Sequence, residues 1–151
     1  MAQTMTPTQT APASRYVDKA NLPGAFFDIA ATSGDKPLLF HKSHRQWANL
    51  NWNQVADAVR RLAAALVVAG VMPRDRVLIS AENRPEWAIA DLAVMSIGAI
   101  VVPAYTTNTE DDHHYVMEHS GAVIAITSGG ILANRIALAA SRVHNMRMLI
   151  L

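Results

Sequence analysis

The stretch RVLISAENRPEWAIADLAVMSIGAIVVPA, residues 76–104, decides the fold. Its start, Val77–Ser80, is too short for a helix and rich in β-branched residues, and it therefore predicts a buried strand. Pro85 is placed where a first helical residue would be, so a helix is expected after the loop Ala81–Arg84. Ala99–Val102 predicts the next strand. Strand, loop, helix and strand in this order indicate a β-α-β unit with parallel strands.

The same alternation continues toward the C-terminus. Further elements are predicted as a helix at Thr109–His119, a strand at Val123–Thr127, a helix at Gly130–Val143 and a strand at Met148–Leu151. The predicted strands are apolar on both faces, which is typical of parallel sheets that helices cover on both sides. The sequence therefore predicts an α/β fold with a mostly parallel sheet covered by helices.

Three more elements are predicted upstream of this unit. They are a short helix at Leu22–Thr32, a hairpin of Leu38–His41 with Gln46–Leu50 across Lys42–Arg45, and a long amphipathic helix. The long helix has the clearest signals, because Asn51 can cap its first turn and Gln54 stands at the position that completes a capping box. Gly70 follows the last apolar repeat and predicts the end of this helix.

Composition limits the classes of protein to which the chain can belong. Its 151 residues amount to about one domain, and 51% hydrophobic against 17% charged residues is typical of a chain with a buried core. The 13 basic and 12 acidic residues nearly cancel and form no basic run, which argues against nucleic acid as a partner. The absence of cysteine excludes disulfides and thiolate chemistry and is consistent with a reducing compartment.

The ends and the apolar segments give further expectations. The polar, uncharged start of the chain has no signal-peptide pattern, so residues 1–15 are expected to be a disordered lead-in. The longest apolar run, Leu92–Ala104, is shorter than the roughly 20 residues that span a bilayer, so no transmembrane segment is predicted. A cytoplasmic location follows, with peripheral attachment to a membrane as the alternative.

Two groups of residues resemble ligand sites at first sight. Thr127–Gly130 lies between a strand and a helix, where backbone N–H groups can hold a phosphate, but it lacks both the Walker and the dinucleotide pattern. A simple strand-to-helix turn is the favoured interpretation. His113, His114 and His119 lie among acidic residues, but helical spacing offers no third metal ligand, so the acids are interpreted as partners of the helix dipole.

Five blocks in uninterrupted order are similar to the N-terminal part of the adenylate-forming acyl-CoA synthetases, most of all to the long-chain fatty-acid branch. The blocks are Leu50–Trp52, Gly70–Val77, Ala81–Trp87, Gly98–Thr107 and Tyr115–Ala122. The resemblance covers about residues 22–151. Two positions depart from the family pattern: Asn51 stands where Thr is usual, and Arg74 stands where Gly is usual.

The resemblance implies a two-step ligase. A carboxylate attacks the α-phosphate of ATP to give acyl-AMP and pyrophosphate, with Mg²⁺ assisting, and coenzyme A then takes the acyl group. Residues 16–151 would form an incomplete N-terminal lobe of the large N-terminal domain, inactive alone, whose partners are a fatty acid and the rest of the synthetase chain. The family's phosphate loop has no counterpart here, because Ile131 follows Thr127–Gly130 where Thr and Gly are required, and no Pro-Lys comes after it. The family's catalytic lysine belongs to a mobile C-terminal domain and also has no counterpart here. No catalytic residue and no metal ligand is therefore assigned.

Two places are expected to contact a ligand in the assembled enzyme. The loop of Tyr105, Thr106, Thr107 and Asn108 follows a strand end, where open α/β sheets bind ligands. Arg135 lies in a segment that some relatives use to bind CoA phosphates. Two alternatives to the CoA ligase stay open: an interaction module that kept the fold without the chemistry, and an adenylating ligase that loads a carrier protein.

Overall fold

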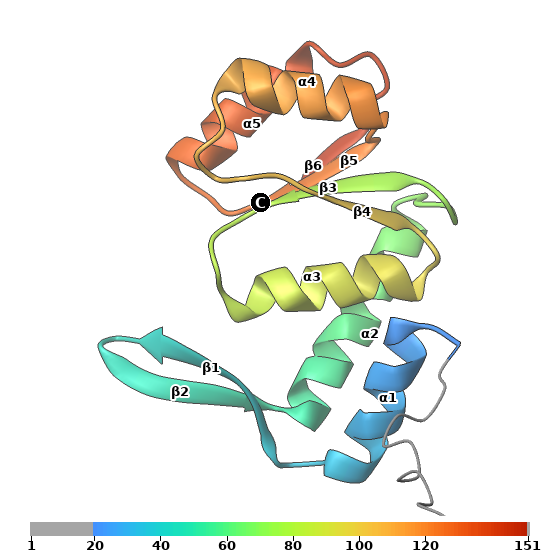
Figure 1. Ribbon diagram of the computed structural model, residues 1–151, viewed down its shortest axis with the longest axis vertical. Helices are drawn as coiled ribbons and strands as arrows, with labels where there is room; N and C mark the ends of the chain where they lie inside the picture. The colour runs from blue at the N-terminus through green and yellow to red at the C-terminus, as the bar shows by residue number, and fades with distance from the viewer. Residues whose placement is uncertain (1–19, 151) are drawn as a thin grey trace, which may run out of the picture.

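A computed structural model describes residues 20–150 of the chain. Its centre is a four-stranded sheet with the order β4-β3-β5-β6 (Figure 1). The strands are β3 (Arg76–Ser80), β4 (Ile100–Pro103), β5 (Ile124–Thr127) and β6 (Met148–Ile150). All three strand pairs are parallel. The predicted parallel α/β sheet is confirmed, with strand limits within one residue of the expected ones, and the expected last strand residue, Leu151, lies outside the described residues.

Helices cover both faces of the sheet (Figure 1). One face carries α2 (Trp52–Val68) and α3 (Pro85–Ser96), and the other carries α4 (Glu110–Ser120) and α5 (Ile131–Ser141). Each side has its own buried cluster. Val59, Val77 and Val94 belong to the first, and Leu78, Met117 and Ile136 belong to the second. Neighbouring residues of β3 thus point to opposite faces of the sheet, and both faces are buried. The continuous apolar run of this strand predicts such burial.

The long helix begins as the sequence predicts. The Asn51 side chain accepts the backbone N–H of Gln54 at 2.8 Å, and the Gln54 side chain accepts the backbone N–H of Asn51 at 2.9 Å. The helix ends at Val68, and Gly70 follows with φ = 82°, a left-handed conformation that glycine adopts without strain. Arg74, which stands where the family usually has glycine, is also left-handed with φ = 72°. The backbone at Arg74 thus adopts a conformation that favours glycine.

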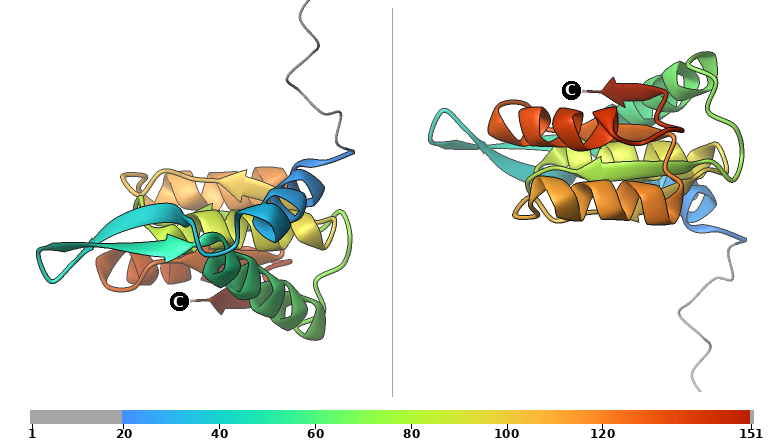
Figure 2. Two further views of the ribbon diagram at one scale, coloured as in Figure 1. Left: turned by 90° about the horizontal axis from the view of Figure 1, so that it is seen from below. Right: turned by 90° about the horizontal axis from the view of Figure 1, so that it is seen from above.

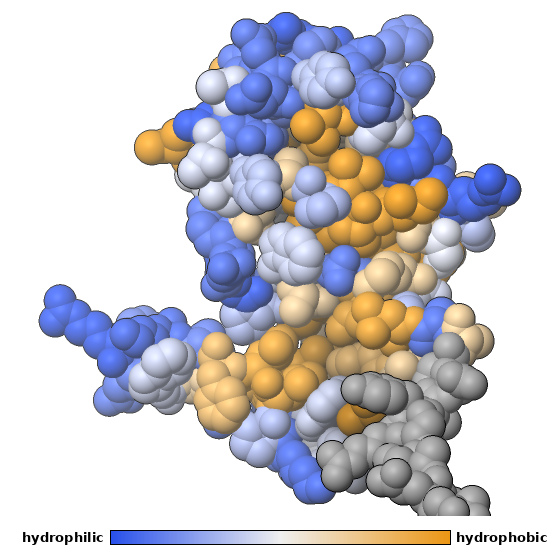
Figure 3. Space-filling model, in the orientation of Figure 1, coloured by the Kyte–Doolittle hydropathy of each residue, from blue (hydrophilic) through white to orange (hydrophobic). Residues whose placement is uncertain are grey.

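The N-terminal part forms a separate layer beside α2 and α3. It consists of α1 (Leu22–Ser33) and a hairpin of β1 (Pro37–Ser43) and β2 (Gln46–Asn51). The hairpin extends away from the helices, and its tip is hydrophilic, whereas hydrophobic surface gathers at its root and near β4 (Figures 2 and 3). The predicted connection Lys42–Arg45 is too long, because the turn contains only His44 and Arg45. Both residues have positive φ, of 50° and 67°, as in the tight turns that match strand twist.

The predicted lead-in at residues 1–15 lies outside the described residues. The structure describes no helix long and apolar enough to cross a membrane within residues 20–150.

Candidate functional site

The crossovers of the sheet diverge between β3 and β5. The chain leaves β3 through α3 toward β4, and leaves β5 through α5 toward β6, on opposite faces of the sheet (Figure 1). At such a switch point the loops after neighbouring strands separate and leave a crevice, which is where open α/β sheets bind ligands. A cleft of about 290 Å³ lies there, between Ala81 on the β3 side and Thr127, Ser128 and Gly129 on the β5 side.

This switch-point cleft has a mostly apolar wall and a polar rim. Leu62, Ile79 and Trp87 line its wall. Thr127 and Ser128 contribute polar groups to its rim, and the Ser128 hydroxyl beside Glu82 lowers the pKa of that exposed carboxyl. Helix α2, the loop after β3 and strand β5 thus all contribute residues to the same opening.

Trp87 separates the switch-point cleft from a second cleft of about 610 Å³. The second cleft lies between the loops after β3 and β4, with Asn83 on one side and Tyr105 and Thr106 on the other. The Tyr105 side chain is 80% exposed. Trp87 thus borders both openings at the carboxyl edge of the sheet.

The other half of the predicted loop faces a different opening. Thr107 and Asn108 line a cleft of about 430 Å³ together with Arg135 of helix α5. The Arg135 guanidinium also holds this loop, because its Nη1 donates to the carbonyl oxygen of Asn108 at 2.7 Å and to that of Thr106 at 3.2 Å. The two places that the sequence singled out separately are therefore in direct contact.

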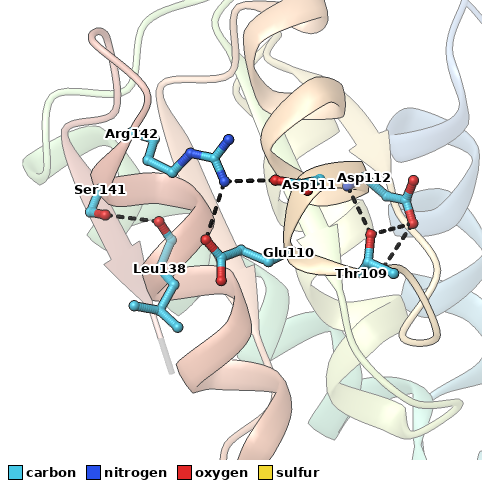
Figure 4. Close-up of polar contacts among 7 residues, drawn as sticks. All are labelled: Thr109, Glu110, Asp111, Asp112, Leu138, Ser141 and Arg142. Carbon is cyan, nitrogen blue, oxygen red and sulfur yellow. Dashed lines mark hydrogen bonds and ion pairs between the residues drawn. The ribbon is translucent and has the colours of Figure 1, made fainter.

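The acidic first turn of α4 is occupied by capping and ion pairing (Figure 4). The Thr109 hydroxyl accepts the backbone N–H of Asp112, and the Asp112 carboxylate accepts the backbone N–H of Thr109 at 2.9 Å. The Thr109 hydroxyl beside Asp112 also holds the pKa of that carboxyl below its usual value. Arg142, the C-cap residue of α5, donates to Asp111 at 2.8 Å and to Glu110 at 3.2 Å. The acids of this turn thus form a cap and ion pairs, and their role as dipole partners stays a prediction.

Replacing Thr109 with alanine is expected to lower the free energy of unfolding by about 1 kcal/mol, because α4 loses a side-chain cap. Urea denaturation followed by circular dichroism measures the change. Thr109→Ser keeps the hydroxyl and serves as the control. An equal loss in the serine variant would show that the methyl group, and not the cap, supports this helix.

His113, which the sequence placed among the candidate metal ligands and set aside, is a buried polar group in the structure. Its side chain is fully buried, and neither ring nitrogen has a hydrogen-bond partner within the described part of the chain. Burial lowers the pKa of His113, the nearby Arg135 charge lowers it further, and Asp112 opposes the shift. The ring is therefore neutral in the folded protein at neutral pH. The signal that could have indicated the burial of His113 is its spacing of four residues from Met117, which places both on one face of the helix.

The stability of the chain is expected to fall as the pH is lowered through about 6.5, the pKa of an unperturbed histidine. Below that pH the unfolded chain binds a proton at His113 that the folded chain excludes, until the lowered pKa of the folded state is also passed. Urea denaturation of His113→Leu at several pH values should show a weaker dependence. The exposed His144, changed to leucine, is the control. An unchanged dependence in His113→Leu would assign the effect to other groups.

The chain is similar to proteins of known family. Residues 26–149 match the family model "AMP-binding enzyme". The long-chain-fatty-acid–CoA ligase FadD15 of Mycobacterium tuberculosis is 32% identical over 101 residues, which are 67% of this chain and 17% of that protein. The chain thus spans about one sixth of the length of this relative.

Solved structures have the same fold. A benzoate CoA ligase from Burkholderia xenovorans superposes with a TM-score of 0.75 at 23% identity, over 85% of this chain and 25% of that one. The Klebsiella oxytoca NpsA N-terminal subdomain, solved in complex with anthranilyl-AMSN, gives a TM-score of 0.68 at 25% identity, over 85% and 30%. The described fold is thus that of the N-terminal domain of adenylate-forming enzymes, and, since the family model covers most of the sequence, the chain belongs to the AMP-binding enzyme family.

Proposed function

We propose that these residues are part of an ATP-dependent long-chain fatty-acid–CoA ligase. The enzyme would join a fatty acid to AMP with release of pyrophosphate, and then transfer the acyl group to coenzyme A. The observation that carries the proposal is the match to the AMP-binding family over residues 26–149, together with 32% identity to a long-chain-fatty-acid–CoA ligase.

The carboxyl edge of the sheet is the part of this lobe that would contact ligands. The switch-point cleft and the cleft beside Tyr105 and Thr106 open there, on either side of Trp87. An apolar wall with a few polar groups at its rim is typical of small-molecule sites. We assign Tyr105, Thr106, Thr107 and Asn108 to the ligand-facing wall of the assembled enzyme.

Arg135 is assigned to the CoA side of this wall. Its guanidinium borders the 430 Å³ cleft. It also holds the loop by hydrogen bonds to the carbonyl oxygens of Thr106 and Asn108. Only Nη1 forms these hydrogen bonds, and within the described residues Nε and Nη2 form none, so they remain able to donate to a phosphate. A guanidinium suits phosphate oxygens because its donors form a fixed planar fork.

The remaining requirements of the chemistry would be met by other parts of the enzyme. ATP and Mg²⁺ need a phosphate loop that ends in lysine, and residues 1–151 contain none. The rest of the synthetase chain is therefore the first partner of this lobe, and the fatty acid is the proposed substrate. We also propose the cytoplasm as its location, since a sequence without cysteine is consistent with a reducing compartment.

Expression of the complete protein that contains these residues tests the proposal. With a long-chain fatty acid, ATP, Mg²⁺ and CoA, the protein should form acyl-CoA and AMP, and omission of CoA should leave acyl-AMP bound. Acyl transfer to a carrier protein but not to CoA would favour the carrier-loading alternative. The absence of both acyl-AMP and thioester would favour the non-catalytic module.

A further inference from the structure

The hairpin β1–β2 has one face packed against the protein, and its other face is mostly exposed but borders the segment Asn83–Glu86 across a cleft of about 480 Å³. Strand pairing sets Leu39 opposite Leu50, and both pack against the first hydrophobic cluster. The other face carries Phe40, Lys42 and Trp47, where Lys42 lies directly opposite Trp47. Phe40 is 63% exposed and Trp47 is 71% exposed. Two large aromatic side chains are thus mostly exposed, and the ribbon of their hairpin extends away from the helices (Figure 2).

The charge of the hairpin is unlike that of the rest of the chain. Residues 37–51 carry Lys42 and Arg45 and no acidic residue, whereas the remaining sequence has eleven basic and twelve acidic residues. Arg45 stands in the two-residue turn, so its charge lies at the tip, where the surface is hydrophilic (Figure 3). Lys42 lies over the Trp47 ring, with Nζ at 5.4 Å from the ring centre. The exposed face therefore combines aromatic rings with positive charge.

We infer that this hairpin face is a docking surface for an anionic lipid bilayer. Tryptophan is enriched at membrane interfaces because its ring is apolar and its N–H is polar. Long basic side chains place their stems along apolar surface and their charges at the headgroups. Charge complementarity favours a bilayer over a second copy of the chain, because two hairpins face to face would bring their cations together.

The arrangement predicts weak, reversible and salt-sensitive attachment. Each basic residue near an anionic surface contributes a few-fold in affinity, so the loss of both Lys42 and Arg45 should weaken binding by about thirtyfold. The inference does not depend on the ligase reaction, because it uses only the face and charge of the hairpin.

Vesicle sedimentation of the purified chain tests the inference. Vesicles of phosphatidylcholine alone are compared with vesicles that also contain phosphatidylglycerol, at low and high salt. Binding is expected only with phosphatidylglycerol and should disappear at high salt. The variants Lys42→Gln with Arg45→Gln, and Phe40→Ser with Trp47→Ser, should both bind more weakly. Circular dichroism of each variant shows whether the fold is kept.

Matched controls come from exposed residues of α2. Arg60→Gln with Arg61→Gln removes the same charge, and Val68→Ser removes an 89% exposed apolar side chain. Both controls should bind like the parent chain. Equal loss in the hairpin and control variants, or no binding to phosphatidylglycerol vesicles, would overturn the inference. Self-association that requires Trp47, without vesicle binding, would overturn it in favour of a second copy.

Discussion

The purified 151-residue chain is expected to show no ATP–pyrophosphate exchange above the rate without enzyme, with any fatty acid. Exchange requires a group that binds the β- and γ-phosphates while the carboxylate attacks the α-phosphate, and positioning and charge stabilisation supply most of the rate in such reactions. The turn Thr127–Gly130 lies between a strand and a helix, but the helix begins at Ile131 and no lysine follows the turn in residues 128–151.

The measurement uses radiolabelled pyrophosphate with ATP, Mg²⁺ and a long-chain fatty acid. The complete protein, assayed in parallel, is the positive control. Exchange that co-purifies with the chain through successive columns and is lost in Ser128→Ala would contradict the expectation. That result would show that the switch-point cleft alone activates ATP.

The fold was largely predictable because its signals are local. The caps at Asn51 and Thr109 and the helix-starting Pro85 mark helix starts by short-range hydrogen bonding and backbone geometry. The hairpin turn was predicted two residues too long, since His44 and Arg45 lack the Asn-Gly or Asp-Gly signal of tight turns. Strand pairing evidently holds these residues in a conformation that their own preferences do not indicate.

The candidate site was less predictable because it depends on the strand order. The sequence indicated the loop after β4, but only the order β4-β3-β5-β6 places the switch point between β3 and β5. The contact between Arg135 and the carbonyl of Asn108 joins positions 27 residues apart. The burial of His113 likewise depends on how α4 packs against the rest of the fold, which spacing along one helix cannot define.

In the complete enzyme, Arg135→Ala is expected to raise the KM for CoA by about ten- to a hundredfold and to leave adenylation unchanged. A charged hydrogen bond to phosphate contributes roughly 1.5–3 kcal/mol, which corresponds to this range of affinity. The guanidinium already holds the carbonyls of Thr106 and Asn108 through Nη1, so the substitution also releases the loop. Thioester formation at varied CoA and pyrophosphate exchange without CoA separate the two half-reactions.

Arg142→Ala is the matched control, because it removes the same charge at the C-cap of the same helix while its contacts are the carboxylates of Glu110 and Asp111. Its KM for CoA should stay near that of the parent enzyme. Amide hydrogen exchange of Thr106 and Asn108 reports the loop independently of catalysis. If Arg135→Ala speeds this exchange and lowers both half-reactions equally, Arg135 acts only by holding the loop. If neither half-reaction changes, the CoA assignment is wrong, because a phosphate contact at this site cannot be removed without weakening CoA.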